Sequence, residues 1–231
     1  MTHGNDKRAA KVLLAVGTAV AALAIAACAP EPGGPAEPTT STTTTSTMPW
    51  SDPVGVWTPF NMNCAANVAG TDYPFLQAAS VNVEAPSTVS QGDSFFATVA
   101  PGPFIVPANV QGFDVTSMSA VAIRFPISAN AQFEDSVLSA GLLIGTGIPS
   151  VKIEGNDLVY RVPGPLAAGA TIQMPKVRVK FKATGAVGTK IEFRMTNMTA
   201  IAKVGVFDIP NNCTPNTPNP LFWSTAITSA S

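Results

Sequence analysis

Beyond about residue 50, short apolar runs alternate with polar positions, and proline, glycine or asparagine interrupts them about every ten residues. Residues 120–125 (AVAIRF) and 80–84 (SVNVE) both alternate in this way. Alternation with such closely spaced turn residues is typical of half-buried strands in an all-β sandwich or barrel. We therefore predict that the folded part of the chain is all-β.

One hairpin can be predicted in register. Two apolar runs, residues 151–153 and 158–160, flank the sequence EGND. Gly155-Asn156 is a two-residue hairpin signal. A turn there places Val151, Ile153, Leu158 and Tyr160 on one face, so the predicted register is self-consistent.

The clearest alternation lies in residues 176–182 (KVRVKFK), and residues 190–196 (KIEFRMT) repeat it after a predicted turn. We expect these two runs to pair as a hairpin, with residue 182 opposite residue 190. That register places Lys180 opposite Glu192 and Arg178 opposite Arg194. The second pair is unfavourable unless an anion or solvent lies between the guanidinium groups.

Two other segments complete the expected elements. Residues 201–209 predict a further strand. In residues 131–143 (AQFEDSVLSAGLL), Phe133, Val137 and Leu138 lie at helical spacing, which makes this segment the candidate helix.

The first 27 residues have the layout of a secretory signal peptide. Residues 1–11 carry three positive charges, and residues 12–27 are uninterrupted small or apolar side chains. This run is short for a membrane span, which needs about 20 residues. It ends in residues 25–28 (IAAC), which resemble the bacterial lipobox. The resemblance implies cleavage before Cys28 and acylation of its thiol, with ordinary cleavage nearby and secretion as the alternative.

Residues 28–49 hold the anchor cysteine and a linker rich in proline, threonine and serine. No bulky apolar residue occurs there before Met48, so the segment buries too little surface to offset its conformational entropy. We expect a disordered linker that resembles O-glycosylated stalks or is a plain spacer, followed by a β-sandwich domain over residues 50–231.

The net charge of the chain restricts the class of partner it can bind. Charged residues make up 12% of the chain, against about a quarter in soluble proteins. Loss of residues 1–27 removes Lys7, Arg8, Lys11 and Asp6, which leaves 10 of 13 basic and 13 of 14 acidic residues. A mature net charge near −3 argues against nucleic acid as a partner.

The three cysteines are an odd number, and lipid on Cys28 would leave Cys64 and Cys213 as a pair. A disulfide between them would close a loop of about 150 residues and contribute about 5 kcal/mol in the chain-entropy model. Two unpaired buried thiols are the alternative. A metal site is not expected, since no histidine lies near these cysteines.

Histidine chemistry is excluded from the mature domain, because the chain's only histidine is His3. Neither a Ser-His-Asp nor a Cys-His catalytic set is then possible, and we expect no enzyme and no cofactor. A glycosidase needs only two carboxylates, for which Glu134-Asp135 and Glu154 with Asp157 are the nearest groups. The first group is better explained as a solvated helix start or turn, and the second as part of the hairpin turn at Gly155-Asn156.

Two surface features suggest binding. Six of the ten mature cations, which form a candidate anion-binding face, fall between residues 176 and 194: Lys176, Arg178, Lys180, Lys182, Lys190 and Arg194. Such a face could bind an acidic glycan, a phosphate-bearing envelope polymer or lipid headgroups. The alternative is a solvated outer face that also discourages edge-to-edge sheet pairing. Trp50, Trp57 and Trp223 lie near the two ends of the domain and form either a sugar-stacking cluster or packing around the disulfide.

A family resemblance rests on turn and strand residues: Cys64, residues 81–86 (VNVEAP), 89–93 (VSQGD), 164–166 (GPL), Gly169, 174–175 (MP) and 183–185 (ATG). Together they resemble secreted actinobacterial immunoglobulin-like domains of unknown function. The resemblance implies an immunoglobulin-like antiparallel β-sandwich in the cell envelope and assigns no catalytic residue.

These features predict an exported lipoprotein on the outer face of the cell membrane, whose domain is a binding or structural module. Its partners would be the membrane, through the lipid on Cys28, and an envelope polysaccharide, a lipid or another surface protein. An envelope carrier of a lipid or other apolar ligand is the alternative, and a carbohydrate-acting enzyme is the third hypothesis. A large apolar cavity would favour the carrier over the module.

Overall fold

The computed structural model describes residues 57–230, and every regular element in that range is a β-strand. Within the same range no helix is long and apolar enough to cross a membrane. The expected signal peptide over residues 1–27, the acylated Cys28, the linker over residues 28–49 and Trp50 lie outside the described residues.

The strands are β1 (Thr58–Val68), β2 (Thr71–Glu84), β3 (Thr88–Ser90), β4 (Ser94–Pro101), β5 (Phe104–Ile105), β6 (Asn109–Val110), β7 (Phe113–Asp114), β8 (Ser117–Pro126), β9 (Ala131–Leu138), β10 (Ser150–Glu154), β11 (Asp157–Val162), β12 (Leu166–Ala167), β13 (Thr171–Ile172), β14 (Val177–Ala183), β15 (Lys190–Arg194), β16 (Asn197–Val204), β17 (Phe207–Pro215) and β18 (Leu221–Thr228).

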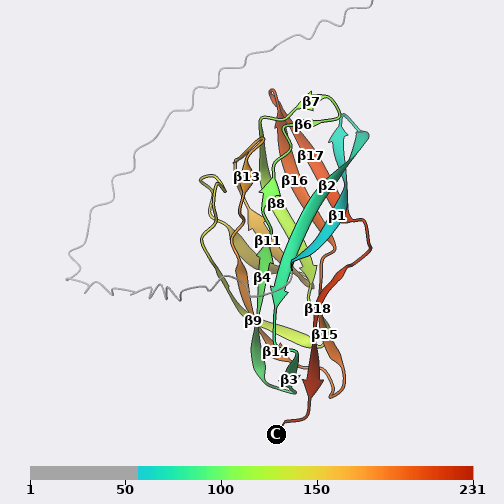
Figure 1. Cartoon of the computed structure of the whole chain (residues 1–231), viewed down its shortest axis with the longest axis vertical. Coiled ribbons are helices and arrows are strands. Elements are labelled where there is room, and N and C mark those ends of the chain that lie inside the picture. Colours follow the sequence, from blue (N-terminus) through green and yellow to red (C-terminus); the bar gives the residue numbers. More distant parts are fainter. Residues whose placement is uncertain (1–56, 231) are drawn as a thin grey trace, which may run out of the picture. The chain divides into compact units, whose positions relative to one another are not determined.

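The predicted all-β sandwich is confirmed (Figure 1). Its main sheet has the order β10-β11-β8-β16-β17-β1-β2-β4-β14-β9, with β12 paired to β8. β2 pairs with β1 through residues 71–81 and with β4 through residues 81–84. Because β2 changes partner along its length, it forms the corner at which the sheet turns over on itself.

One apolar core lies between the two halves of this folded sheet. Met62 on β1, Ala97 on β4 and Tyr160 on β11 belong to the same buried cluster. A three-stranded sheet, β15-β18-β3, closes one end and contributes Ile191 and Ile227 to that cluster. Its β3–β18 pair is parallel, whereas the ladders of the main sheet are antiparallel.

The predicted hairpin of residues 151–160 is confirmed. Val151 pairs with Tyr160 and Ile153 pairs with Leu158, so these four side chains share a face as expected. Gly155 has a φ of 62°, which suits the first central position of a two-residue turn.

The expected pairing of residues 176–182 with 190–196 is wrong. β14 lies between β4 and β9, and β15 pairs with β18 in the three-stranded sheet. Lys180 is therefore opposite Phe96 and Asp135 rather than Glu192. The connection between β14 and β15 crosses from one sheet to another, which local alternation does not reveal.

The candidate helix over residues 131–143 is also wrong, because residues 131–138 form strand β9. The register with β14 shifts between Lys180, opposite Asp135, and Phe181, opposite Phe133. Glu134 is the extra residue of this bulge, and it interrupts the alternation of the strand. Because of the extra residue, the inward positions after Phe133 are Ser136 and Leu138, three and five residues further along the chain. Such odd separations resemble the spacing on one face of a helix.

The run of residues 201–209 contains a turn. It supplies the end of β16 and the start of β17, joined at Gly205, whose φ is 56°. β17 continues to Pro215 and places Cys213 directly opposite Cys64 on β1.

The predicted disulfide between Cys64 and Cys213 is confirmed, with a sequence separation of 149. Both residues are buried in the core, at 3% and 2% exposure. The bond therefore joins the first and the next-to-last long strands of the domain, at the centre of the main sheet.

The segment of residues 139–149, between β9 and β10, contains no charged residue and exposes Leu142, Leu143 and Ile148. Leu142 nevertheless exchanges two backbone hydrogen bonds with Gln173, of 2.8 and 3.0 Å. A Cβ on Gly145 would meet the carbonyl oxygen of Pro165. The segment is thus packed closely against two other parts of the chain.

The disulfide predicts a large stability difference. Cys64→Ala/Cys213→Ala should lower the free energy of unfolding by about 2–5 kcal/mol, because the unfolded chain regains the entropy of a long loop. Urea denaturation of the full chain measures this loss. Reduction of the unsubstituted chain is the matched control and should reproduce it; equal stability of oxidised and reduced chains would contradict the assignment.

A glycine pair tests the packing of residues 139–149. Gly145 and Gly188 both have positive φ, of 77° and 87°, but a Cβ on Gly188 meets nothing within 4 Å. Gly188→Ala should cost about 1 kcal/mol from backbone strain, and Gly145→Ala at least about 1 kcal/mol more, since the backbone at Pro165 must shift. Equal urea midpoints for the two variants would show that the segment is not held there.

Candidate functional site

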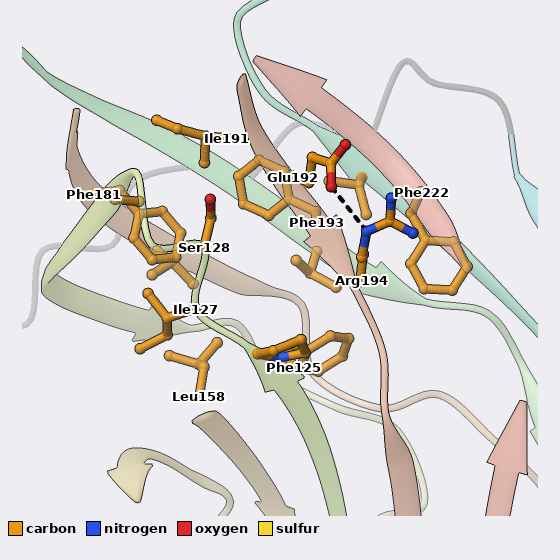
Figure 2. A pocket seen from close by; sticks show the side chains of 15 residues that line it. Phe125, Ile127, Ser128, Leu158, Phe181, Ile191, Glu192, Phe193, Arg194 and Phe222 are labelled. Carbon is orange, nitrogen blue, oxygen red and sulfur yellow. Dashed lines mark hydrogen bonds and ion pairs between the residues drawn. The ribbon is translucent and has the colours of Figure 1, made fainter. Parts of the chain in front are cut away.

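The space between the sheets is well filled. One cavity there, lined by Phe125, Leu158 and Phe193 among others, has a volume of about 30 Å³ (Figure 2). A neighbouring one, lined by Met62, Met174 and Met198 among others, has about 40 Å³. Such volumes hold about one water molecule each, whereas ligand sites occupy about 300–1,000 Å³. Neither cavity offers room for a lipid.

A much larger hollow is lined by residues of the β6–β7 hairpin and of the ends of β1, β16 and β17. These elements lie at the end of the domain opposite the C-terminus (Figure 1). We call this hollow the end groove, and its volume is about 740 Å³. Its lining is mostly apolar: Ala66, Val68, Val110, Phe113, Val115, Ala202, Val204, Phe207 and Ile209, with Asn67, Asp208 and Asn211 as its main polar members.

Three hairpin tips of six residues each surround the end groove. They are residues 67–72 (NVAGTD), 109–114 (NVQGFD) and 203–208 (KVGVFD). In each tip, the first and last residues are directly opposite each other across the two strands. In each tip the second residue is a valine that lines the groove, namely Val68, Val110 or Val204.

Side-chain bonds close each tip in the same way. Asn67 Nδ2 donates to Asp72 Oδ1 at 2.7 Å, and Asn109 Nδ2 donates to Asp114 Oδ1 at 3.0 Å. In the third tip Lys203 Nζ takes the place of the amide and lies 3.0 Å from Asp208 Oδ1. The aspartates thus fix the tips, and the tips fix the positions of the valines.

The β6–β7 hairpin is held over the sheet from both sides. The Thr116 backbone N–H donates to Lys203 O at 2.8 Å, and Gln111 Nε2 donates to Pro74 O at 2.7 Å. The Phe113 ring packs edge-on against Tyr73, with centroids 5.3 Å apart. The floor beneath carries the small residues Ala66 and Ala202, which are buried in one cluster with Val110 and Val115.

One polar side chain in the groove retains an unused acceptor. Asn211 is 5% exposed, and its Nδ2 donates to Ile209 O at 2.9 Å. Among residues 57–230, no side chain or backbone N–H donates to its amide oxygen. A ligand with an N–H donor would therefore find an acceptor there.

The end groove was not anticipated from the sequence. Its residues come from β1, the β6–β7 hairpin, β16 and β17, so strand alternation does not bring them together. A signal was present nonetheless, since residues 67–72 and 109–114 both have the pattern Asn-Val-x-Gly-x-Asp. Each glycine has positive φ, of 86° and 87°, as a tight hairpin turn requires.

The structure divides the candidate anion-binding face. Lys176, Arg178, Lys180 and Lys182 lie on or just before β14, whereas Lys190 and Arg194 lie on β15 in another sheet. The Lys180 ammonium pairs with Glu134 at 3.0 Å, and Arg194 Nε pairs with Glu192 at 3.0 Å. The Arg178 guanidinium lies 4.1 Å from the centre of the exposed Phe96 ring. Anion binding by this face stays a prediction.

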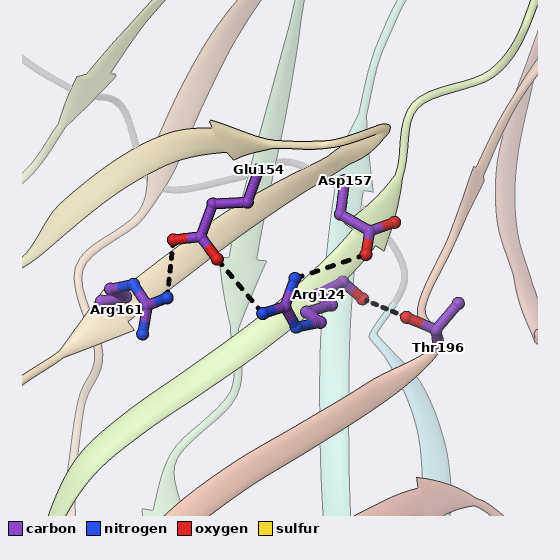
Figure 3. Close-up of polar contacts among 5 residues, drawn as sticks. All are labelled: Arg124, Glu154, Asp157, Arg161 and Thr196. Atoms are coloured by element: carbon purple, nitrogen blue, oxygen red, sulfur yellow. Dashed lines mark hydrogen bonds and ion pairs between the residues drawn. The ribbon is translucent and has the colours of Figure 1, made fainter.

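The two candidate carboxylate groups are held in ion pairs. Glu154 Oε1 lies 2.6 Å from Arg161 Nη2, while Arg124 lies 3.1 Å from Glu154 Oε2 and 3.5 Å from Asp157 Oδ2 (Figure 3). The hydrogen bond from Arg161 holds the pKa of Glu154 below its usual range, and that from Lys180 does the same for Glu134. A glycosidase acid instead needs a raised pKa.

The aromatic cluster expected around the disulfide is not formed by the described residues. Trp57 is 41% exposed just before β1, and Trp223 packs against Val81, Val83 and Val99. Between residues 57 and 230, no ring contact joins the two tryptophans. In the same part of the chain, no three His, Cys, Asp or Glu side chains gather as a metal site.

No protein-family model and no curated protein sequence matches the chain. Among solved structures, a Corynebacterium diphtheriae protein described as membrane-anchored superposes with a TM-score of 0.54 at 14% identity. The match covers 76% of this chain and 38% of that one, so this chain spans well under half of its neighbour's length. At this identity the likeness shows the fold alone.

Two cohesins are more distant neighbours. A cohesin module of a Clostridium perfringens family 33 glycoside hydrolase gives a TM-score of 0.40 at 12% identity, over 67% of this chain and 99% of that one. A non-cellulosomal cohesin of Archaeoglobus fulgidus gives 0.36 at 13% identity, over 64% and 91%. Scores this low carry no argument about function.

Proposed function

We propose that this chain is a cell-surface protein, anchored to a membrane by lipid on Cys28, whose β-sandwich binds a partner through the end groove. The observation that carries the proposal is the contrast between the end groove, of about 740 Å³, and the interior cavities, of about 30 and 40 Å³. Large apolar hollows on a protein surface are the usual binding sites.

The exposed rim of the groove supports the same proposal. Val206 and Phe207, at the tip between β16 and β17, are 80% and 67% exposed. Exposing such side chains beside an apolar hollow loses the free energy that their burial would contribute, about 25 cal/mol for each Å². A partner that covers the groove and its rim would recover that free energy.

The second candidate function, a carrier of a lipid or other apolar ligand, depends on the same groove and not on the core. The groove is open at the end of the domain, which suits a projecting part of a partner better than a ligand that must be enclosed. The proposal includes no catalytic activity, because Glu134, Glu154 and Asp157 are ion-paired.

The anchor is tested by metabolic labelling with a radioactive fatty acid. The full chain should carry the label and sediment with membranes, and Cys28→Ala should lose the label because the acceptor thiol is gone. Cys64→Ala/Cys213→Ala is the control for a general effect of cysteine loss and should keep the label. Label retained in Cys28→Ala would contradict anchoring at this residue.

Binding in the groove is tested with Nile red, a neutral apolar dye, on the full chain carrying Cys28→Ala. The dye should bind, and adding Ala202→Trp should weaken binding at least about fivefold, because the indole fills the space above β16. Ala78→Trp adds the same ring at an exposed position on β2 and should have no effect.

A second groove variant, Phe207→Ser, guards against misfolding of the first. Its side chain is 67% exposed, so its loss should leave the circular dichroism spectrum unchanged while it weakens dye binding. Equal dye binding by the unsubstituted, Ala202→Trp and Phe207→Ser chains would refute the groove as a binding site.

A further inference from the structure

A second surface of the domain carries an unusual set of polar side chains. On β1, β2, β16 and β17, the residues that alternate with the buried core point to the outer face of the main sheet. We call this surface the amide face, and its polar members are Asn61, Asn63, Asn67, Thr199, Asn212 and Thr214. No charged residue occurs in the strand segments that form it, which are residues 58–68, 73–83, 196–202 and 209–215.

The strand register brings these side chains into rows across the sheet. Asn212 on β17 is directly opposite Thr199 on β16 on one side and Ala65 on β1 on the other. Asn63 on β1 is likewise opposite Thr214 on β17. Amide and hydroxyl groups thus occupy neighbouring positions on three adjacent strands, which are spaced about 5 Å apart.

A hollow of about 550 Å³ lies in the amide face. We call it the polar hollow, and its lining includes Asn67, Asp72, Thr199, Asn212 and the small residue Ala65. Among residues 57–230, no side chain or backbone group bonds to the side chains of Thr199 and Asn212, and Asp72 uses only Oδ1, which accepts from Asn67. The hollow therefore offers both hydrogen-bond donors and acceptors to a ligand.

The residue types of the amide face conflict with local preference. Asparagine is depleted in β-strands, because its side chain competes for backbone hydrogen bonds, yet four asparagines lie at outward strand positions here. The polar hollow also borders Ala120, a bulge residue whose φ of 50° is uncommon outside glycine. A face that needed only to be soluble would carry threonine, which favours strands, or charged residues. Conflicts of this kind are expected at functional sites.

We infer that the amide face is a second binding surface, which takes a neutral polysaccharide with a sugar unit in the polar hollow. The inference goes beyond the proposed function, which concerns the end groove. Each sugar hydroxyl both donates and accepts a hydrogen bond, and a side-chain amide provides the matching pair of groups. Leu76, which is opposite Asn63 and 72% exposed, would contact the C–H groups of a sugar ring.

Other occupants match these groups less well. A nucleic acid or an acidic polymer would need cations, and the four strand segments of the face contain none. A lipid would leave the amides and hydroxyls without partners, which costs free energy for each polar group that it covers. Stable protein interfaces usually centre on aromatic or arginine side chains, and the outward positions of these segments have neither.

The test is native gel electrophoresis of the full chain carrying Cys28→Ala, in gels that contain a soluble polysaccharide. At least one neutral polymer among dextran, mannan, galactan and arabinan should slow the chain relative to a gel without polymer. The acidic polymer polygalacturonate should not slow it, because the polar hollow offers the carboxylate of Asp72 and no cation.

An asparagine pair assigns the binding to the amide face. In Asn63→Ala/Asn212→Ala, the polymer concentration that gives half-maximal retardation should rise at least about tenfold, because two side chains lose their hydrogen bonds to the sugar. Both side chains are exposed and have no partner in the described part of the chain, so the urea midpoint should not change. Gln91→Ala/Gln132→Ala removes two exposed amides elsewhere and is the matched control, which should bind like the unsubstituted chain.

Three outcomes would contradict the inference. The first is a mobility that is the same with and without each neutral polymer. The second is equal retardation of Asn63→Ala/Asn212→Ala and the unsubstituted chain, since the polysaccharide would then bind elsewhere. The third is retardation by polygalacturonate alone, which would indicate a site for anions. The end groove is tested separately by Nile red, so the proposed function and this inference can fail independently.

Discussion

The rest of this structure depends on the change of partner along β2. Residues 71–81 pair with β1 and residues 81–84 pair with β4, so one continuous sheet turns over and faces itself. Without that turn, Met62 and Ala97 would lie on one face of an open sheet, exposed to water; with it, they meet in a single core. The disulfide lies close to this turn, because Cys64 is on β1, the neighbour of β2, and is bonded to Cys213 on β17. It reinforces the sheet at strands that the chain order places far apart.

The folded sheet also explains where a binding site can be. Large side chains such as Phe95, Phe181 and Tyr160 fill the space between its halves and leave cavities of about 30 and 40 Å³. At the end formed by the hairpin tips, the floor residues Ala66 and Ala202 are small, and the cover is a two-stranded hairpin rather than a full layer. The end groove is thus much larger than the interior cavities, and the polar hollow of about 550 Å³, lined by Asp72, Thr199 and Asn212 among others, lies on neighbouring strands. Between the module and the carrier that the sequence suggested, this arrangement better suits a module that receives part of a partner.

Which parts of this fold the sequence predicts depends on how far apart along the chain the interacting residues lie. The hairpin at Gly155-Asn156 is local, and turn chemistry with alternation was enough to give its register. The disulfide was predictable because, of three cysteines, one lies in the predicted lipobox and only Cys64 and Cys213 remain to pair. The pairing of β14 with β15 failed because nothing in two adjacent alternating runs distinguishes a hairpin from a crossing between sheets. The helix failed because a bulge at Glu134 changes the period of a strand from within.

The end groove shows what kind of signal a single sequence can still hold. Its three tips are separated by dozens of residues, and no periodicity of one strand connects them. Each tip nevertheless has the same local structure. Its first and sixth side chains bond across the turn, and its second residue is a valine that lines the groove. Two tips share the pattern Asn-Val-x-Gly-x-Asp, and the third has Lys203 in place of the asparagine and its glycine, Gly205, one position earlier. A purely structural tip needs a turn glycine and one bonded pair, but it does not need a side chain as exposed as Phe207. The repetition of these apolar positions around one opening is therefore better explained by a shared surface for a partner than by the separate needs of three turns.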